Sequence, residues 1–418
     1  MLVKTILNRL QHFKGFIYDS IKLVTAGTAV ALEISIRPRA NSRPCCGTCQ
    51  KQGSKYGTLP QRLYEFVPLW GIKTYFRYTP RRVQCHACRA ISVEHLPWAN
   101  GKEHHSSILQ QFLAHWAKQL NWQQVAEEFQ VSWNSVYRAV TYVVTWGLAH
   151  RDLSGITALG VDELMTWKGY RYVTMVYQID THCKRLLWLC KDRTAESFAR
   201  CFEHLGPTIC AGIKYICSDM WRGYLQVIHE RLPQALHVLD RFHIVANLNK
   251  ALDEVRADEA KRLKLSGDDQ TLKHTRWCLL KRPGNLTKKQ RRRLKDLLQL
   301  NLKTVRAYLL AKDFGHFWKY NHPNWAARFL DAWYRMVMRS RIKPLKKIAC
   351  QLRSHKELIL NWFRTKKMFS SGVVEALNNN AKLTIRKAYG FRAFKGLEIA
   401  LFHTLGALPE PPLTNKFW

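Results

Sequence analysis

The sequence lacks any hydrophobic run long enough to span a bilayer. A membrane-spanning helix needs about 20 predominantly apolar residues, whereas the longest apolar stretch, residues 24–32, is short and is followed by Glu33. Residues 1–9 also lack the long hydrophobic region and small-residue cleavage site of a signal peptide. There is no internal repeat and no low-complexity segment. We therefore expect a cytoplasmic protein with no membrane association.

Acidic residues are scarce as well. The 30 Asp and Glu stand against 67 Lys and Arg, which gives a formal net charge of +37. A compact protein repels itself at such a charge unless a polyanion neutralises it. Nucleic acid is the first candidate partner, because each phosphate contact releases a counterion; a membrane surface is the weaker alternative. Hydrophobic residues make up 47% of the 418 residues, which suits two or three folded domains.

Two C-x-x-C pairs, 35 residues apart, predict a structural zinc site. Each pair directs two thiolates at one ion, so two pairs complete a tetrahedral Cys₄ set. The expected ligands are Cys46, Cys49, Cys85 and Cys88. Residues 64–70 and 73–78 between the pairs are strand-like, as a zinc ribbon requires. The alternative is that these are incidental or redox thiols, and His86 is a conceivable substitute ligand.

Residues 121–138 have the pattern of a helix-turn-helix. Val125, Ala126 and Phe129 are expected to pack the first helix against the core. Ser132 is expected to cap the second helix, and Val136 and Val140 are expected to face the core. Any helical hairpin shows similar periodicity, so the zinc ribbon and the charge add weight to this interpretation. The residues expected to face a DNA groove are Trp133, Asn134, Ser135, Tyr137 and Arg138.

From residue 158 onward the sequence pattern is that of a mixed α/β domain. The expected strands are 158–165, 172–179, 185–190, 214–217 and 236–239, with helices at 195–205, 221–232 and from 241 onward. This element order is that of a ribonuclease H-like fold. It is preceded by the zinc ribbon and the helix-turn-helix, and it is interrupted by a helical insertion.

Three carboxylates occupy positions that are suited to metal binding and catalysis. Asp162 lies inside an apolar strand, where an ionised group is costly unless something binds it. Asp219 follows the end of another strand, where ligand sites gather. Glu375 lies in the first turns of a helix. In a ribonuclease H-like fold the three converge and can hold two Mg²⁺ ions, with Mn²⁺ as a substitute. Glu163 competes for the first position but points to the opposite face of the strand.

Asp240-Arg-Phe-His243 opens the helix after the fifth strand. Asp240 is a suitable N-cap for that helix. His243 is either a buried structural histidine or a catalytic residue near the metals that contacts the scissile phosphate. Both interpretations stay open on the sequence alone.

Residues 241–370 carry 32 Lys and Arg against 10 Asp and Glu, a net charge of +22. Such charge is often a solvated helix face, and its aromatic residues are more often core than base-stacking platforms. The excess exceeds what solubility needs, so we expect this segment to grip DNA, with Arg291, Arg292 and Arg293 as contacts.

Taken together, these motifs resemble the bacterial insertion-sequence transposases of the ISL-three family, from about Cys46 to Phe402. The motifs are the two C-x-x-C pairs, the helix-turn-helix, Gly160-Val-Asp-Glu, Ser218-Asp-Met-Trp, Asp240-Arg-Phe-His and Ser371-Gly-Val-Val-Glu-Ala-Leu-Asn-Asn. One departure is Cys45-Cys46, where a proline is expected before the glycine. The alternatives are a catalytically inert DNA-binding protein or repressor derived from a transposase and, on charge and aromatic content alone, an RNA-binding protein.

The resemblance implies a DDE transposase that binds the terminal inverted repeats of its element and moves it by strand cleavage and strand transfer into target DNA. It assigns catalysis to Asp162, Asp219 and Glu375, and it implies a nucleoid-associated homodimer or higher oligomer. The expected domains are a zinc-ribbon segment (1–100), a helix-turn-helix domain (101–150), a catalytic domain (151–254 and 366–405) and a basic helical insertion (255–365).

Overall fold

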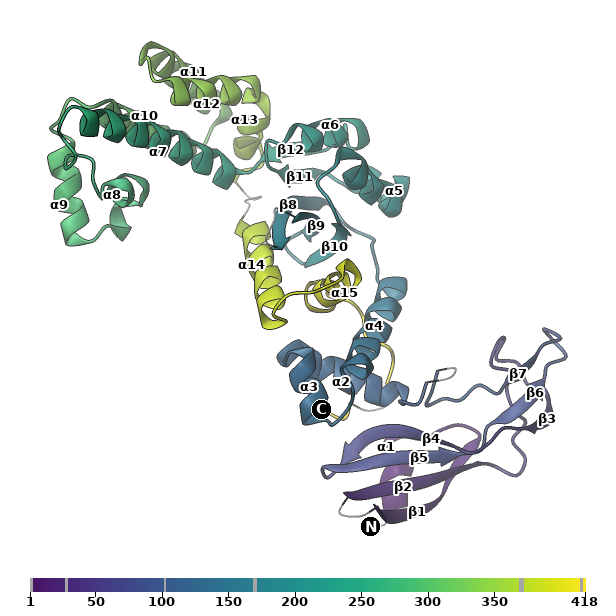
Figure 1. Ribbon diagram of the computed structural model, residues 1–418. Helices are drawn as coiled ribbons and strands as arrows, with labels where there is room; N and C mark the ends of the chain where they lie inside the picture. The colour runs from purple at the N-terminus through teal and green to yellow at the C-terminus, as the bar shows by residue number, and fades with distance from the viewer. Residues whose placement is uncertain (1–2, 27–28, 101–102, 168–170, 368–371, 414–415) are drawn as a thin grey trace. The chain divides into compact units, whose positions relative to one another are not determined.

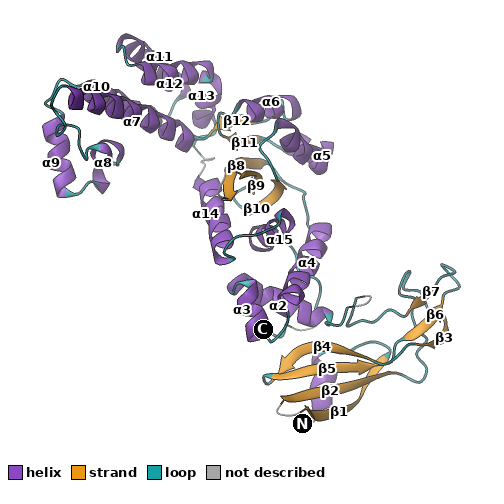
Figure 2. Cartoon of the chain, in the orientation of Figure 1, coloured by secondary structure: helices purple, strands orange, loops and turns teal. Residues whose placement is uncertain are grey.

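The computed structural model describes residues 3–26, 29–100, 103–167, 171–367, 372–413 and 416–418. The chain divides into two compact units, one made of residues 1–152 with 383–418 and the other of residues 153–382. Figure 1 traces the path of the chain and Figure 2 its helices and strands. None of the helices described has both the length and the apolar character needed to cross a bilayer.

The first unit begins with a four-stranded sheet in the order β1-β2-β5-β4, in which β2 and β5 run parallel. The indole of Trp98 is fully buried, and the rings of Phe13, Phe16 and Tyr78 surround it at 4.9–5.2 Å between centroids. The elements are α1 (Val3–Leu10), β1 (Phe16–Ala26), β2 (Ala29–Pro38), β4 (Arg62–Leu69) and β5 (Ile72–Tyr78).

A separate three-stranded sheet carries the cysteines. It consists of β3 (Ser54–Thr58), β6 (Arg81–Gln84) and β7 (Ile91–Val93), in the order β3-β6-β7. The expectation that residues 64–70 and 73–78 are ribbon strands is therefore wrong. They form β4 and β5, because alternate side chains of β5, such as Phe76 and Tyr78, are buried in the core around Trp98.

Helices complete the first unit. They are α2 (Ser107–Gln119), α3 (Trp122–Glu128), α4 (Trp133–His150) and α15 (Phe394–Leu405). The three successive helices begin at capping side chains, since Ser106, Asn121 and Ser132 each accept a hydrogen bond from the backbone N–H three residues on. Val125, Ala126, Val136 and Val140 are buried, as the sequence predicts.

The second unit contains a mixed five-stranded sheet in the order β10-β9-β8-β11-β12. The first three strands are antiparallel, and β11 runs parallel to both β8 and β12. All five strands lie within two residues of their expected positions. They are β8 (Ala158–Trp167), β9 (Arg171–Ile179), β10 (Lys184–Cys190), β11 (Tyr215–Ser218) and β12 (Leu236–Leu239), with helices α5 (Ala195–Gly212) and α6 (Arg222–Arg231).

Successive side chains of β8 belong to opposite faces of the sheet. Leu159 and Val161 join the core that α5 and α6 bury, together with Phe198 and Tyr224. Gly160, between them, faces α14 (Gly372–Lys387). A Cβ atom at Gly160 would lie only 2.4 Å from Val374 Cγ2, so the absence of a side chain lets the helix approach the strand closely.

The remaining helices form a second hydrophobic core that includes Val238 and Leu239 of β12. Asn361 Nδ2 donates a hydrogen bond of 2.7 Å to the backbone oxygen of His237 and so ties the end of this insertion back to the sheet. The helices are α7 (Arg241–Leu265), α8 (Arg276–Leu280), α9 (Lys288–Leu297), α10 (Lys303–Phe314), α11 (Pro323–Arg339), α12 (Lys343–Ser354) and α13 (Lys356–Arg364), with short 3₁₀ turns at Pro283–Asn285 and Phe317–Lys319.

Candidate functional site

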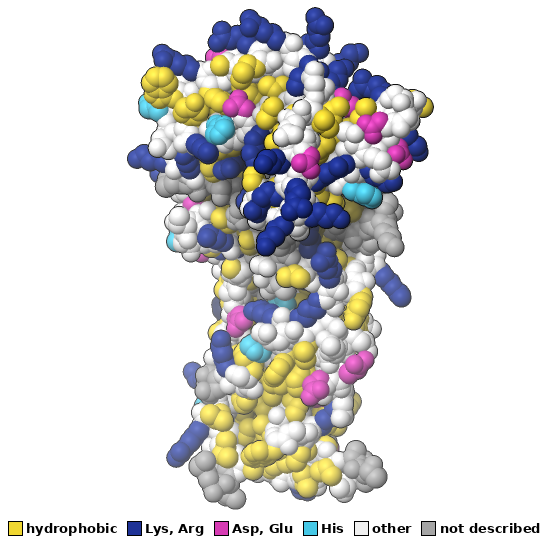
Figure 3. All heavy atoms as spheres, turned by 90° about the vertical axis from the view of Figure 1, so that its left-hand side faces the viewer, with side chains coloured by type: hydrophobic (Ala, Val, Ile, Leu, Met, Phe, Trp, Pro, Cys, Tyr) yellow, Lys and Arg dark blue, Asp and Glu magenta, His cyan; other side chains and the backbone are white. Residues whose placement is uncertain are grey.

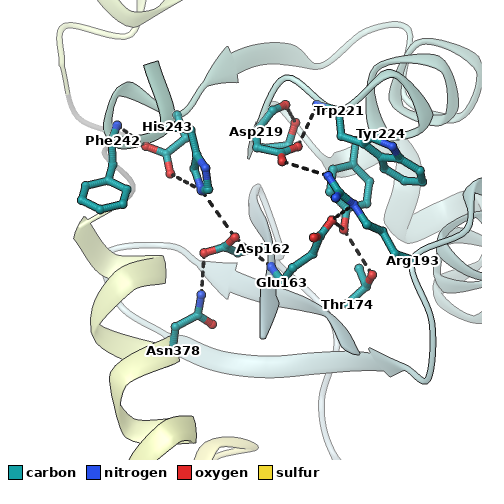
Figure 4. Close-up of polar contacts among 12 residues, drawn as sticks. Asp162, Glu163, Thr174, Arg193, Asp219, Trp221, Tyr224, Phe242, His243 and Asn378 are labelled. Carbon is teal, nitrogen blue, oxygen red and sulfur yellow. Dashed lines mark hydrogen bonds and ion pairs between the residues drawn. The ribbon is translucent and has the colours of Figure 1, made fainter. Parts of the chain in front are cut away.

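Asp162 lies on the central strand β8 and faces α14 (Figure 4). Asn378 Nδ2, on α14, donates a hydrogen bond of 2.5 Å to Asp162 Oδ2. The buried hydroxyl of Tyr177 donates in turn to Asn378 Oδ1 at 2.8 Å. Asp162 is therefore oriented by a helix more than 200 residues away in sequence.

Asp219 follows the carboxyl end of β11, the strand parallel to β8. The backbone N–H of Trp221 donates to Asp219 Oδ1 at 2.9 Å, and Arg193 Nη2 lies 3.5 Å from Asp219 Oδ2. Burial raises the pKa of Asp219, although the Trp221 N–H partly offsets it. A partly desolvated carboxylate of this kind is stabilised by a nearby cation.

Glu163 contacts a different set of groups from Asp162, as the alternation along a strand predicts. It forms a close ion pair with Arg193 and accepts a hydrogen bond of 3.0 Å from the hydroxyl of Tyr224. The same Arg193 reaches Asp219, so one guanidinium links Glu163 and Asp219 (Figure 4). Burial raises the pKa of Glu163.

Asp240 is the N-cap of α7, since its Oδ1 accepts a 2.6 Å hydrogen bond from the N–H of Phe242. His243, one turn further on, is partly exposed and lies between two carboxylates. Its Nε2 is 3.6 Å from both Asp162 Oδ1 and Asp240 Oδ2. The interaction with Asp162 raises the pKa of His243 to about 9.

Glu375 lies on α14, three residues before Asn378, and its side chain is exposed. Residues three apart on a helix are neighbours on its surface, so Glu375 is one turn from the group that holds Asp162. Within the described part of the chain, only the four cysteines bring three or more potential metal-ligand atoms within 4.8 Å of one another. Asp162, Asp219 and Glu375 therefore do not form such a cluster here, and carboxylates repel one another unless a cation lies between them.

The donor set of this region suits Mg²⁺ or Mn²⁺. Asp162, Asp219 and Glu375 offer only carboxylate oxygens, the ligands that these hard cations prefer. The two aspartates extend from adjacent parallel strands, β8 and β11. The residues present therefore fit a divalent cation.

Four residues of this region were given no role from the sequence, namely Asn378, Tyr177, Arg193 and Tyr224. Helical spacing from Glu375 was a usable signal for Asn378, because the two differ by three positions. The other three had no such signal. Their roles depend on the pairing of β9 with β8 and on the docking of α6, which bring residues distant in sequence together.

The groove-facing residues expected of the helix-turn-helix lie at the start of α4. Trp133, Asn134 and Arg138 are exposed, whereas Ser135 and Tyr137 are partly buried. Trp133 and Tyr137 stack with ring planes 4° apart and 5.6 Å between centroids, and Trp122 of α3 packs against both. The first turn of α4 thus presents a polar residue, Asn134, beside a preformed aromatic cluster.

The four cysteines of the C-x-x-C pairs meet as the sequence predicts. Cys46 Sγ lies 3.7 Å from Cys88 Sγ, and Cys49 Sγ lies 3.4 Å from Cys85 Sγ. Four sulfurs at about 2.3 Å from a tetrahedral ion lie about 3.8 Å apart, so the cluster fits Zn²⁺. The hydroxyl of Ser92, 3.2 Å from Cys46 Sγ, lowers the pKa of that thiol.

The chain thus combines a helix-turn-helix with an α/β domain whose adjacent parallel strands β8 and β11 carry carboxylates. The chain matches a family model described as "Transposase" over residues 159–401, and a model described as "Helix-turn-helix domain of transposase family ISL3" over residues 94–144. The first match spans more than half of the chain. The protein therefore belongs to the ISL3 family of transposases, and its helix-turn-helix implies DNA binding.

Curated relatives agree with this assignment. The transposase for insertion sequence element IS1001 of Bordetella parapertussis is 30% identical over 365 residues, which cover 86% of this chain and 88% of the relative. The transposase for insertion sequence element IS1557 of Mycobacterium tuberculosis is 25% identical over 417 residues, which cover 93% of this chain and 91% of the relative.

Asn378→Ala is expected to weaken the attachment of α14 to β8. The substitution removes the hydrogen bond to Asp162 and takes one partner from the buried Tyr177 hydroxyl, which costs about 1–3 kcal/mol of unfolding free energy. Urea denaturation of Asn378→Ala and of the exposed neighbour Asn379→Ala measures the difference. Equal losses in the two variants would contradict this account of the contact.

The cysteine cluster is expected to hold one Zn²⁺ per chain, because four convergent thiolates form a closed structural site. Elemental analysis of the purified protein should find the zinc, and Cys88→Ser should lose most of it and lower the thermal midpoint. Cys45→Ser is the matched control, since Cys45 lies outside the cluster. Zinc content that is the same in all three proteins would rule out this ligand set.

Proposed function

We propose that this transposase binds the terminal inverted repeats of its insertion sequence and catalyses metal-dependent DNA strand cleavage and strand transfer. Asp162, Asp219 and Glu375 are its catalytic carboxylates, and residues 151–254 with 366–405 form a ribonuclease H-like catalytic domain. Because two element ends must be joined to target DNA, the working form is a dimer or a higher oligomer.

The observation that carries the proposal is the hydrogen bond between Asn378 and Asp162. It fixes α14 against the strand that carries the first carboxylate, and Glu375 lies one turn away on the same helix. Asp219 lies at the end of the neighbouring parallel strand. The strand order, with three antiparallel strands followed by two parallel ones, supports the ribonuclease H-like assignment.

Each side chain then has a role that its contacts support. The three carboxylates would hold Mg²⁺ or Mn²⁺, which when bound activates the attacking oxygen and stabilises the leaving oxygen. Asn378 orients Asp162 by donating to one carboxylate oxygen. His243, which lies beside Asp162 and is partly exposed, is placed to contact the scissile phosphate.

The basic insertion supplies a second contact with DNA. Lys and Arg side chains gather over its helices in Figure 3. Arg291, Arg292 and Arg293 on α9 are exposed, but they differ in their contacts. Arg293 Nη2 donates to the backbone oxygens of Gln270 and Thr271 and so also supports a loop. Arg291 Nη2 makes only one long contact, 3.5 Å to the backbone oxygen of Leu286, so Arg291 and Arg292 are the better probes of DNA contact.

Cleavage of a labelled duplex carrying the element's terminal repeat is expected to require Mg²⁺ and to stop in EDTA. Glu375→Gln should reduce the rate by about 10²–10³-fold, because it removes a charge that balances the cation. Glu230→Gln, an exposed carboxylate on α6, is the matched control and should cleave normally. A duplex bound tightly by wild type and Glu375→Gln but cleaved by neither would favour the inert DNA-binding alternative.

Reversing two charges on α9 is expected to flatten the salt dependence of DNA binding. Each phosphate contact contributes about 0.9 to the slope of log affinity against log salt concentration, so Arg291→Glu with Arg292→Glu should lower it by about 2. Fluorescence anisotropy at several salt concentrations measures the slope. Arg231→Glu, on α6, tests whether any charge reversal has this effect, and an unchanged slope in the α9 double variant would exclude α9 from the interface.

A further inference from the structure

The turn between β4 and β5 presents a tryptophan in an unfavourable backbone conformation. Trp70 has a φ of 53° and Gly71 a φ of 76°, the pattern of a two-residue hairpin turn that favours Asn-Gly. A bulky residue at positive φ is a genuine outlier. The side chain of Trp70 nevertheless points outward and leaves the residue 71% exposed. Hairpin stability alone therefore does not explain this residue.

The hairpin is fastened to the helix-turn-helix within the same compact unit. Lys73 Nζ, just after the turn, donates a 2.8 Å hydrogen bond to the backbone oxygen of Gln130, in the turn between α3 and α4. Glu65, on the opposite strand, lies 3.3 Å from both Lys73 and His105. The hairpin and the DNA-binding helices are thus linked by side chains at the tip.

Backbone pairing strengthens this connection. The N–H of Glu65 donates to the oxygen of His104 at 2.7 Å, and the N–H of Ser106 donates to the oxygen of Glu65 at 2.8 Å. Ser106 is also the N-cap of α2. Strand β4 therefore pairs with the segment that leads into the helix-turn-helix, which fixes the hairpin against these helices.

The contact of Lys73 with Gln130 places the hairpin beside the N-terminal end of α4. In a helix-turn-helix the N-terminal end of the second helix enters the major groove, and Gln130 lies three residues before the first residue of α4. Leu69 and Ile72 are the last paired residues of the hairpin, so Trp70 and Gly71 extend beyond them.

We propose that the β4–β5 hairpin is a wing that contacts duplex DNA beside the groove bound by α4, with Trp70 packed on the sugar-phosphate backbone. The flat indole offers an apolar face to deoxyribose and an N–H donor to a phosphate oxygen. Lys73 is a positioning residue, because its ammonium holds the hairpin to Gln130 and Glu65. This inference rests on the proposed DNA binding by the helix-turn-helix.

Trp70→Asn separates a DNA contact from a structural role. Asn tolerates positive φ better than Trp does, so the variant should keep or raise the thermal midpoint of the wild type. Its affinity for a fluorescein-labelled terminal-repeat duplex should fall about five- to tenfold, within the range of a single lost contact. The salt slope should not change, because no charge is removed. A hydroxyl-radical footprint should lose protection on one flank of the α4 site.

Leu63→Thr is the matched control, since Leu63 is also exposed on β4 but lies at the other end of the strand from the turn. It should bind as wild type does. Equal affinity and an unchanged footprint in Trp70→Asn would overturn the wing while leaving DNA binding intact. Failure of the wild type to bind any duplex would overturn the DNA-binding proposal itself. A change in the sedimentation of free Trp70→Asn, with an unchanged footprint, would make the hairpin a protein contact and also overturn the wing.

Discussion

The close approach of α14 to β8 is the constraint on which the second unit depends. Gly160 lets Val374 approach the strand closely. Asn378 then donates a hydrogen bond to Asp162 and accepts one from the hydroxyl of Tyr177. The residues joined in this way are separated by more than 200 positions, and the whole basic insertion lies between them in sequence.

Charge distribution explains why this unit suits a polyanionic substrate. Asp162 and Glu163 lie within β8 and Asp219 follows β11, and the ion pairs with Arg193 and His243 partly balance these three carboxylates. The insertion carries most of the excess positive charge of the chain. A nucleic acid is attracted to the basic helices but repelled by exposed carboxylates, so a divalent cation between the carboxylates and a phosphate would make the two regions compatible.

The first unit shows how distant pairing limits inference from local patterns. The strands at 64–70 and 73–78 were visible in the sequence, but their partner was not. Strand β5 pairs in parallel with β2, about 40 residues earlier, and its aromatic residues enclose Trp98. A strand pattern does not specify which strand lies beside it. Because residues 64–70 and 73–78 lie between the two cysteine pairs, they were assigned to the zinc ribbon, although they belong to the other sheet.

The cysteine spacing, the capped helices of the helix-turn-helix, the order of strands and helices around Asp162 and Asp219, and the positive charge could all be read from the amino-acid sequence, because each depends on residues near one another in the chain. Which residues hold those groups in place became visible only in the folded protein. Asn378 on Asp162, Arg193 between Glu163 and Asp219, and Lys73 on Gln130 all join segments far apart in sequence. Such contacts form when strands pair and helices dock, and they cannot be predicted from local periodicity.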